Sequence, residues 1–80
     1  MKKPSIGFVL IECKQEYMKD IVNQLDEIDV VKETLRVEGL WRLVAKLEAP
    51  NLDNIRESIQ WKIRNMTGIE STLTLVEYMW

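Results

Sequence analysis

Two short polar segments of the sequence carry the side chains best suited to bind a small ligand. Hydroxyl and carboxylate groups beside exposed backbone can bind the amine and the carboxylate of a small polar molecule. The same residue types are also typical of an ordinary turn and strand, because glycine permits positive φ and threonine favours strands. The segments read Val37-Glu38-Gly39-Leu40-Trp41-Arg42 and Glu70-Ser71-Thr72-Leu73-Thr74.

The sequence offers no set of side chains for catalysis, so we predict that the protein is not an enzyme. Histidine, the commonest general base, is absent. Cys13 is the single cysteine, with only Lys14 beside it, and a structural role at a strand end is favoured. The adjacent acids Asp26 and Glu27 would not face one another on a helix and indicate a solvated surface. With a lone cysteine and isolated glycines, we predict no disulfide, metal or cofactor.

Charge and hydropathy exclude two classes of partner. The net charge is −2, and the longest basic run is Lys2-Lys3, whereas a DNA-binding domain needs a concentrated basic surface. No apolar run approaches the roughly 20 residues of a membrane span, and the apolar stretch 6–11 is too short for a signal peptide. An unpaired cysteine fits a reducing compartment, so we expect a cytoplasmic protein.

Hydrophobic periodicity predicts the elements that position the polar segments. Residues 6–11 favour a central strand, since both faces are apolar. Residues 30–37 and 40–48 predict a hairpin with its turn at Glu38-Gly39, and its first strand is expected at an edge. Residues 69–78 predict a last strand, entered through Gly68. Two helical stripes lie between the strands, at Met18, Ile21, Val22, Leu25 and Ile28, and at Leu52, Ile55, Ile59, Ile63 and Met66, with Asn51 or Asp53 as a cap.

The order β-α-β-β-α-β predicts an α+β, ferredoxin-like fold in one domain spanning residues 1–80. In this fold a four-stranded antiparallel sheet has both helices on one face and the first and third strands in the middle. The other face should be polar in a monomer. Here it receives one side of the apolar first strand, Val76 and Tyr78 of the last strand, and Val44 or Trp41 of the third.

An apolar sheet face on a chain of 80 residues predicts self-association. A domain this small needs further stabilisation, and disulfides and metals are already excluded. We therefore expect a dimer that packs sheet to sheet about a two-fold axis. The alternative is a moderately apolar face that remains exposed to solvent in a monomer. Trp61 and Trp80 are either ordinary surface residues or contacts of a second interface.

The whole chain resembles the effector domain of the Lrp/AsnC family of transcription regulators, also called the RAM domain. The resemblance rests on the first strand at 6–11 and on the junction at 25–31. The most specific segments are 37–47 and 67–75, which are similar to the family's V-x-G-x-[aromatic]-D-[aliphatic] hairpin and its G-[V/I]-x-x-[S/T]-x-T strand opening.

The resemblance implies a dimeric α/β barrel that often assembles further, with an amino acid bound between dimers. It implies ligand contacts at the hairpin turn and at the start of the last strand. Arg42 replaces the family's usual aspartate, and arginine favours a carboxylate or another anion over an amino group. The residues carried over as ligand-binding are Gly39, Leu40, Trp41, Arg42, Glu70, Ser71, Thr72 and Thr74.

The family's helix-turn-helix is not found in this sequence, so direct DNA binding is not expected. The leading hypothesis is a stand-alone, oligomeric, small-molecule-sensing domain. One alternative is a structural partner that associates with full-length Lrp/AsnC relatives and binds no ligand. A second is a small enzyme of the dimeric barrel type, for which no catalytic set is found.

Overall fold

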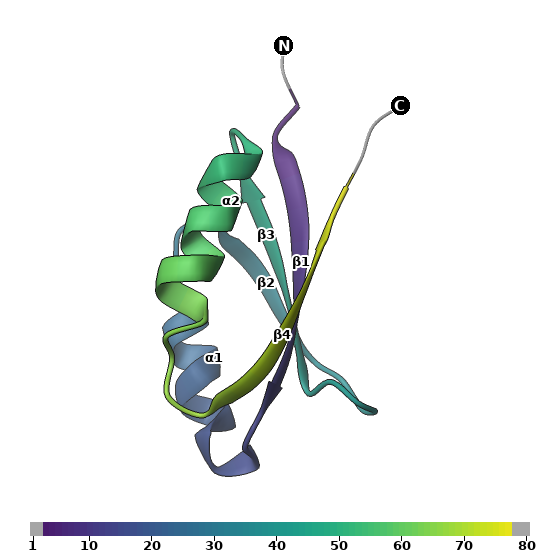
Figure 1. The fold of residues 1–80 in the computed structure, drawn as a ribbon, viewed down its shortest axis with the longest axis vertical. Helices are drawn as coiled ribbons and strands as arrows, with labels where there is room; N and C mark the ends of the chain where they lie inside the picture. The colour runs from purple at the N-terminus through teal and green to yellow at the C-terminus, as the bar shows by residue number, and fades with distance from the viewer. Residues whose placement is uncertain (1–2, 78–80) are drawn as a thin grey trace.

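The computed structural model, which describes residues 3–77, has the predicted β-α-β-β-α-β order. All pairings in its four-stranded sheet are antiparallel and the strand order is β2-β3-β1-β4, so β1 and β3 are central as expected. Figure 1 shows both helical segments on one face of the sheet, which confirms the ferredoxin-like prediction. The elements are β1 (Ser5–Cys13), η1 (Gln15–Tyr17), α1 (Met18–Asp26), β2 (Val31–Arg36), β3 (Leu43–Ala49), α2 (Leu52–Ser58), η2 (Ile59–Ile63) and β4 (Ile69–Val76).

The core lies between the two central strands and the helices. Alternate residues of β1 and β3 are buried, which is the period-two pattern of a strand with one face packed. Both predicted helical stripes supply the opposite layer, and Ile21, Leu25, Ile55 and Ile63 have no exposed surface. Cys13 is buried in the same core, as a structural cysteine would be.

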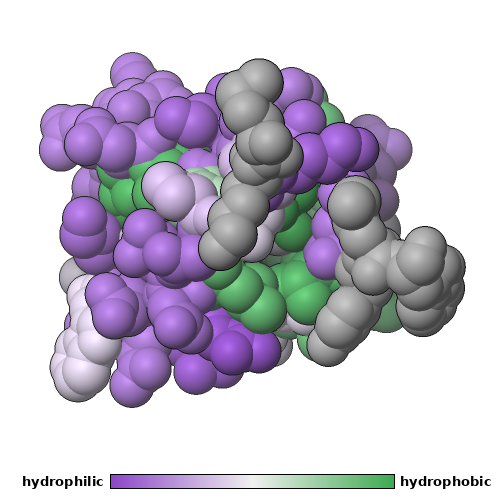
Figure 2. Space-filling model, turned by 90° about the horizontal axis from the view of Figure 1, so that it is seen from above, coloured by the Kyte–Doolittle hydropathy of each residue, from purple (hydrophilic) through white to green (hydrophobic). Residues whose placement is uncertain are grey.

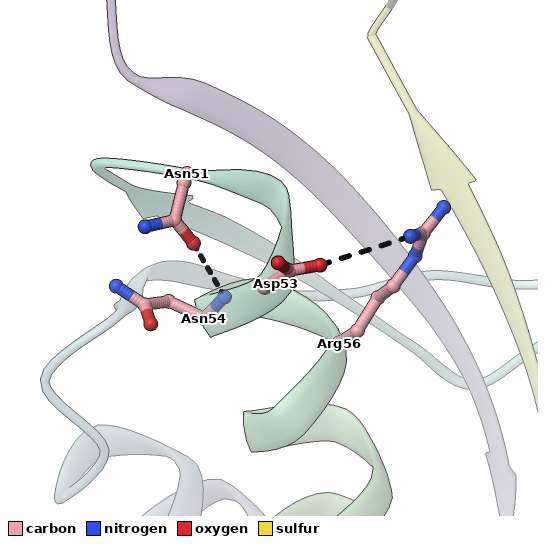
Figure 3. Close-up of polar contacts among 4 residues, drawn as sticks. All are labelled: Asn51, Asp53, Asn54 and Arg56. Carbon is pink, nitrogen blue, oxygen red and sulfur yellow. Dashed lines mark hydrogen bonds and ion pairs between the residues drawn. The ribbon is translucent and has the colours of Figure 1, made fainter.

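The second helix begins at a side-chain cap and widens in its second half. Asn51 Oδ1 accepts a hydrogen bond from the backbone N–H of Asn54 at 2.9 Å, which satisfies one of the unpaired donors at the helix start (Figure 3). Residues Ile59–Ile63 then form a π-helical turn, in which the N–H of Arg64 donates to the carbonyl of Ile59 at 2.9 Å. The sequence pattern predicted the cap but not the wide turn.

The prediction of which β4 residues face away from the helices was wrong. Leu75 pairs with Phe8 and Leu73 with Leu10, so these two leucines lie on the uncovered face, while Val76 pairs with Gly7. The cause is a β-bulge: Cys13 pairs with Ile69 but Glu12 pairs with Ser71, which leaves Glu70 as an extra residue. The alternation therefore reverses after Ile69. Tyr78 and Trp80 lie outside the described residues.

The predicted hairpin is confirmed, but its second strand is shorter than expected. β3 begins at Leu43 rather than Leu40, and β2 ends at Arg36. The loop between them is closed by a hydrogen bond from the N–H of Val37 to the carbonyl of Arg42 at 2.9 Å. Gly39 has φ +125°, which accounts for the glycine at this turn.

The sheet face opposite the helices, which we call the open face, carries an apolar row across all four strands. The register sets Leu35 beside Val44, Val44 beside Leu10 and Leu10 beside Leu73. This resolves the third strand's contribution in favour of Val44. Leu35, Leu73 and Leu75 are 50%, 46% and 50% exposed. Figure 2, which views the molecule from above, shows a mostly hydrophilic surface with hydrophobic side chains exposed between the hydrophilic ones.

Candidate functional site

The end of β1 brings together part of the predicted ligand-binding set. The N–H of Arg42 donates to the carbonyl of Ile11 at 3.0 Å, so the end of the hairpin loop lies against β1. On the other side, Ser71 of β4 pairs with Glu12 of β1. By strand alternation Glu12 and Ser71 follow the apolar row on the open face, and Arg42, which precedes β3, lies against Ile11 next to them, so the three residues form a row at the end of β1. Glu70 follows at the bulge.

The remaining predicted residues lie apart from this row. Thr72 pairs with Ile11 and Thr74 with Val9, so both threonines lie on the helix face of the sheet. Arg64 reaches Thr72 from the second helix, with its Nε donating to Thr72 Oγ1 at 3.4 Å. Gly39 and Leu40 lie farther out on the loop, where Leu40 is 86% exposed, and Trp41 is half-buried.

Sequence reasoning missed two neighbours of the predicted residues. Glu12 pairs with Ser71 and follows Ile11, whose carbonyl accepts the Arg42 N–H, and Arg64 lines a depression of about 380 Å³ with Ile69, Glu70, Ser71 and Thr72. The pairing of Glu12 with Ser71 could not be predicted from the sequence, because the bulge changes the register between β1 and β4. Arg64 could be assigned to the exposed side of a helix, but not to the side that faces β4.

The charges at this end of the sheet are not paired with one another. Among residues 3–77 the only side-chain ion pair within 4 Å joins Arg56 and Asp53, elsewhere on the molecule. The Arg42 guanidinium and the Glu70 carboxylate are both close enough to act on the Cys13 thiol. This end of the sheet therefore offers a cation for a carboxylate, acids for an ammonium group and the Ser71 hydroxyl for either.

Burial raises the pKa of Cys13 above its ordinary value of 9.0. The Arg42 charge lowers that pKa and the Glu70 charge raises it further, and both effects are smaller than burial. A raised pKa keeps the thiol protonated at neutral pH, and a protonated thiol is a poor nucleophile. The cysteine is thus suited to packing rather than to covalent chemistry.

We predict slow alkylation of Cys13 by iodoacetamide at pH 7.5 in the folded protein and at least tenfold faster alkylation in urea, measured by mass spectrometry. The folded state holds the thiol proton more tightly than the unfolded state, so the free energy of unfolding should fall as pH rises above 9.0. A Cys13→Ala variant should lose that part of the pH dependence. Equal alkylation rates in the folded and urea-unfolded protein would show that the thiol is not protected.

Two kinds of feature are absent from the part of the chain that the structure describes. No group of three or more cysteine, aspartate or glutamate side chains between residues 3 and 77 is arranged to hold a metal ion. Within the same residues, no helix has the length and apolar character to cross a membrane.

Comparison with known proteins shows which sequences this chain resembles. The chain is 29% identical to an uncharacterized HTH-type transcriptional regulator of Pyrococcus furiosus, in an alignment covering 98% of this chain and 56% of the relative. The chain thus spans about half the length of the curated relatives it matches.

Solved structures share the fold. FFRP-DM1 superposes with a TM-score of 0.87 at 27% identity, covering 92% of this chain and 99% of that one. A transcriptional regulator of Neisseria meningitidis, solved as an L-Met complex, superposes with a TM-score of 0.84 at 6% identity. That superposition covers 94% of this chain and 50% of the regulator, and the low identity makes it a likeness of fold alone.

A family model described as the Lrp/AsnC ligand binding domain matches residues 6–78. The match includes both polar segments, the hairpin loop and the β4 bulge, and it agrees with the resemblance of the sequence. This chain belongs to the Lrp/AsnC ligand binding domain family, which is a family of transcriptional regulators.

Proposed function

We propose that this chain is a regulatory domain that binds a small amino-acid-like effector at the end of β1 and self-associates through its open face. The observation that carries the proposal is the row of Arg42, Glu12 and Ser71, with Glu70 beside it. Opposite charges that have no ion-pair partner among residues 3–77 suit the carboxylate and the ammonium group of a zwitterion. Of the residues predicted from the sequence, we keep Arg42, Glu70 and Ser71 for this site, with Gly39, Leu40 and Trp41 of the adjoining loop, and we add Glu12. Thr72 and Thr74 lie on the helix face of the sheet and are left out of it.

Arg42 changes the orientation in which we expect the effector to bind, because the family usually has an aspartate at this position. A guanidinium binds a carboxylate through two parallel hydrogen bonds, whereas the family's usual aspartate would repel it. We therefore assign the effector carboxylate to Arg42 and the ammonium group to Glu12 and Glu70. Support for an amino acid comes from the family description and from the L-Met complex of the Neisseria meningitidis regulator.

Self-association is the second part of the proposal. Burying one large apolar side chain contributes roughly 1.5–3 kcal/mol, and the open face presents six. Even partial burial of these side chains is comparable to the net stability of a small domain, about 5 kcal/mol. The ligand row adjoins the same face, so a second copy would enclose it and exclude water. The six side chains are Phe8, Leu10, Leu35, Val44, Leu73 and Leu75.

A thermal-shift screen against the twenty amino acids tests the effector site. A ligand at a hundredfold excess over its dissociation constant stabilises the folded state by about 2.7 kcal/mol, so at least one amino acid should raise Tm by several degrees. Arg42→Ala and Ser71→Ala should each abolish most of that rise. The exposed Lys19, on α1, provides the control, and Lys19→Ala should leave the shift intact.

The open face also supports a second candidate function, that of an association partner of full-length Lrp/AsnC regulators without a ligand of its own. The apolar row across four strands favours it, because that row needs a partner but no effector. In the screen, an unchanged Tm with all twenty amino acids would contradict effector binding and favour this candidate. In either case we propose a reducing, cytoplasmic setting, consistent with the buried free thiol of Cys13.

A further inference from the structure

A groove of about 270 Å³ lies between the second helix and β4, on the opposite side of the sheet from the open face. We propose that this groove is a second binding site, which takes a small dicarboxylate with one carboxylate at Arg64 and the other at Arg56. Apart from one apolar residue, the lining side chains are all hydrogen-bond donors. The lining residues are Arg56, Ile59, Gln60, Arg64 and Thr74.

The wide helical turn keeps the donors in one row. Arg56, Gln60 and Arg64 recur at steps of four, and on an uninterrupted α-helix each such step rotates a residue by about 40°. The π-turn between Ile59 and Arg64 has more residues per turn and offsets part of that rotation. Arg64 consequently still faces β4, as its hydrogen bond to Thr72 Oγ1 shows.

The strand side of the groove is polar because the helices do not cover it. Val9 and Ile11, the β1 partners of Thr74 and Thr72, have no exposed surface beneath the helices. One strand farther out, Thr72 is half-buried and Thr74 is exposed. The two hydroxyls therefore lie at the surface beside the arginines, and the buried Ile59 supplies an apolar contact.

Both arginines are available to a ligand. Among the described residues, Arg64 has no carboxylate within ion-pair distance. Arg56 has only Asp53, at 3.9 Å, and the two side chains are 64% and 84% exposed, so this pair contributes little. Figure 3 shows the Arg56 side chain extending from α2 toward β4. Glu70 lines the neighbouring depression with Arg64 and does not line the groove.

The spacing of the arginines selects the ligand class. Eight helical residues separate their Cα atoms by about 12 Å, and each guanidinium can reach inward toward the groove. A compact anion such as phosphate can satisfy one guanidinium only. A short dicarboxylate can bind both, with its methylene groups over Ile59. Each carboxylate then receives the paired hydrogen bonds that guanidinium groups donate.

Isothermal titration of the full chain with glutarate tests the site. Glutarate has no ammonium group, so it does not depend on Glu12 or Glu70, and this site and the proposed amino-acid site can fail separately. We expect one glutarate per chain and at least tenfold weaker binding in both Arg56→Gln and Arg64→Gln. Arg64→Lys, which keeps the charge and loses the paired hydrogen bonds, should lie between Arg64→Gln and the wild type.

Arg36→Gln is the matched control, because Arg36 is an exposed arginine on the opposite edge strand, β2. It removes the same charge and should leave glutarate affinity unchanged. Circular dichroism of every variant confirms that it is folded. Three results would overturn the proposal: no heat of glutarate binding, equal weakening by Arg36→Gln, or inorganic phosphate binding as tightly as glutarate.

Discussion

Leu73→Glu should convert the proposed sheet-to-sheet dimer to a monomer at micromolar concentration. Leu73 is 46% exposed on the open face and lies beside Leu10, at the β4 end of the apolar row. In a sheet-to-sheet dimer the new carboxylate would be buried without a partner in both copies. We expect a cost of at least about 3 kcal/mol, which corresponds to a dissociation constant raised more than a hundredfold. Sedimentation velocity over a concentration series measures this change.

Leu40→Glu is the control for Leu73→Glu. It introduces the same charge at an apolar residue that is 86% exposed on the hairpin loop, away from the apolar row. The Leu40→Glu protein should self-associate as strongly as the wild type. Because Leu73 lies on an edge strand and is already half exposed, Leu73→Glu should also remain folded. A folded Leu73→Glu protein with wild-type self-association would rule out the open face as the interface.

Gly68→Ala should have the largest effect on folding. Gly68 has φ +95°, which side-chain-bearing residues rarely adopt, and a Cβ there would overlap the Tyr17 side chain. The carbonyl of Gly68 also accepts a hydrogen bond from the N–H of Lys14 at 3.1 Å, which ties the start of β4 to the segment after β1. Backbone strain and overlap each cost about 1–3 kcal/mol, so we expect a loss of about 3 kcal/mol or more.

Gly39→Ala measures the free-energy cost of backbone strain alone, without the overlap that Gly68→Ala adds. Gly39 also has positive φ, at +125°, but an added Cβ would meet no atom within 4 Å. We therefore expect a loss of about 1–2 kcal/mol for Gly39→Ala. Urea denaturation of both variants measures the two free energies of unfolding. Equal losses would show that Gly68 is needed only for its φ, and that the contact with Tyr17 is unimportant.

The helices and strands could be predicted from the sequence because burial in this small domain is strongly periodic. Ile55, Ile59 and Ile63 predicted the second helix, and the alternation of Leu43, Ala45 and Leu47 predicted β3, since one face of each is fully buried. The assignment failed on β4, where one extra residue at Glu70 reverses which side chains face the core. A bulge of this kind leaves no mark in hydropathy when the residues on both sides of it alternate.

Only part of the candidate site could be predicted from the sequence. The family motif pointed to the hairpin loop and to the start of β4, and the structure brings Arg42 and Ser71 to the same end of the sheet. Glu12 and Arg64 were missed, because their proximity depends on strand register and on a widened helical turn. Neither feature is encoded by the residue types alone.

The central proposal is that the row at the end of β1 binds an amino-acid-like effector, and amide chemical-shift mapping tests it most directly. The ¹⁵N-labelled chain is small enough, at 9.5 kDa per copy, for its amides to be followed during titration with the amino acid that raises Tm most. We predict shifts concentrated at residues 12, 39–42 and 70–74. Shifts confined to other parts of the chain, or none with any of the twenty amino acids, would contradict the proposed effector site.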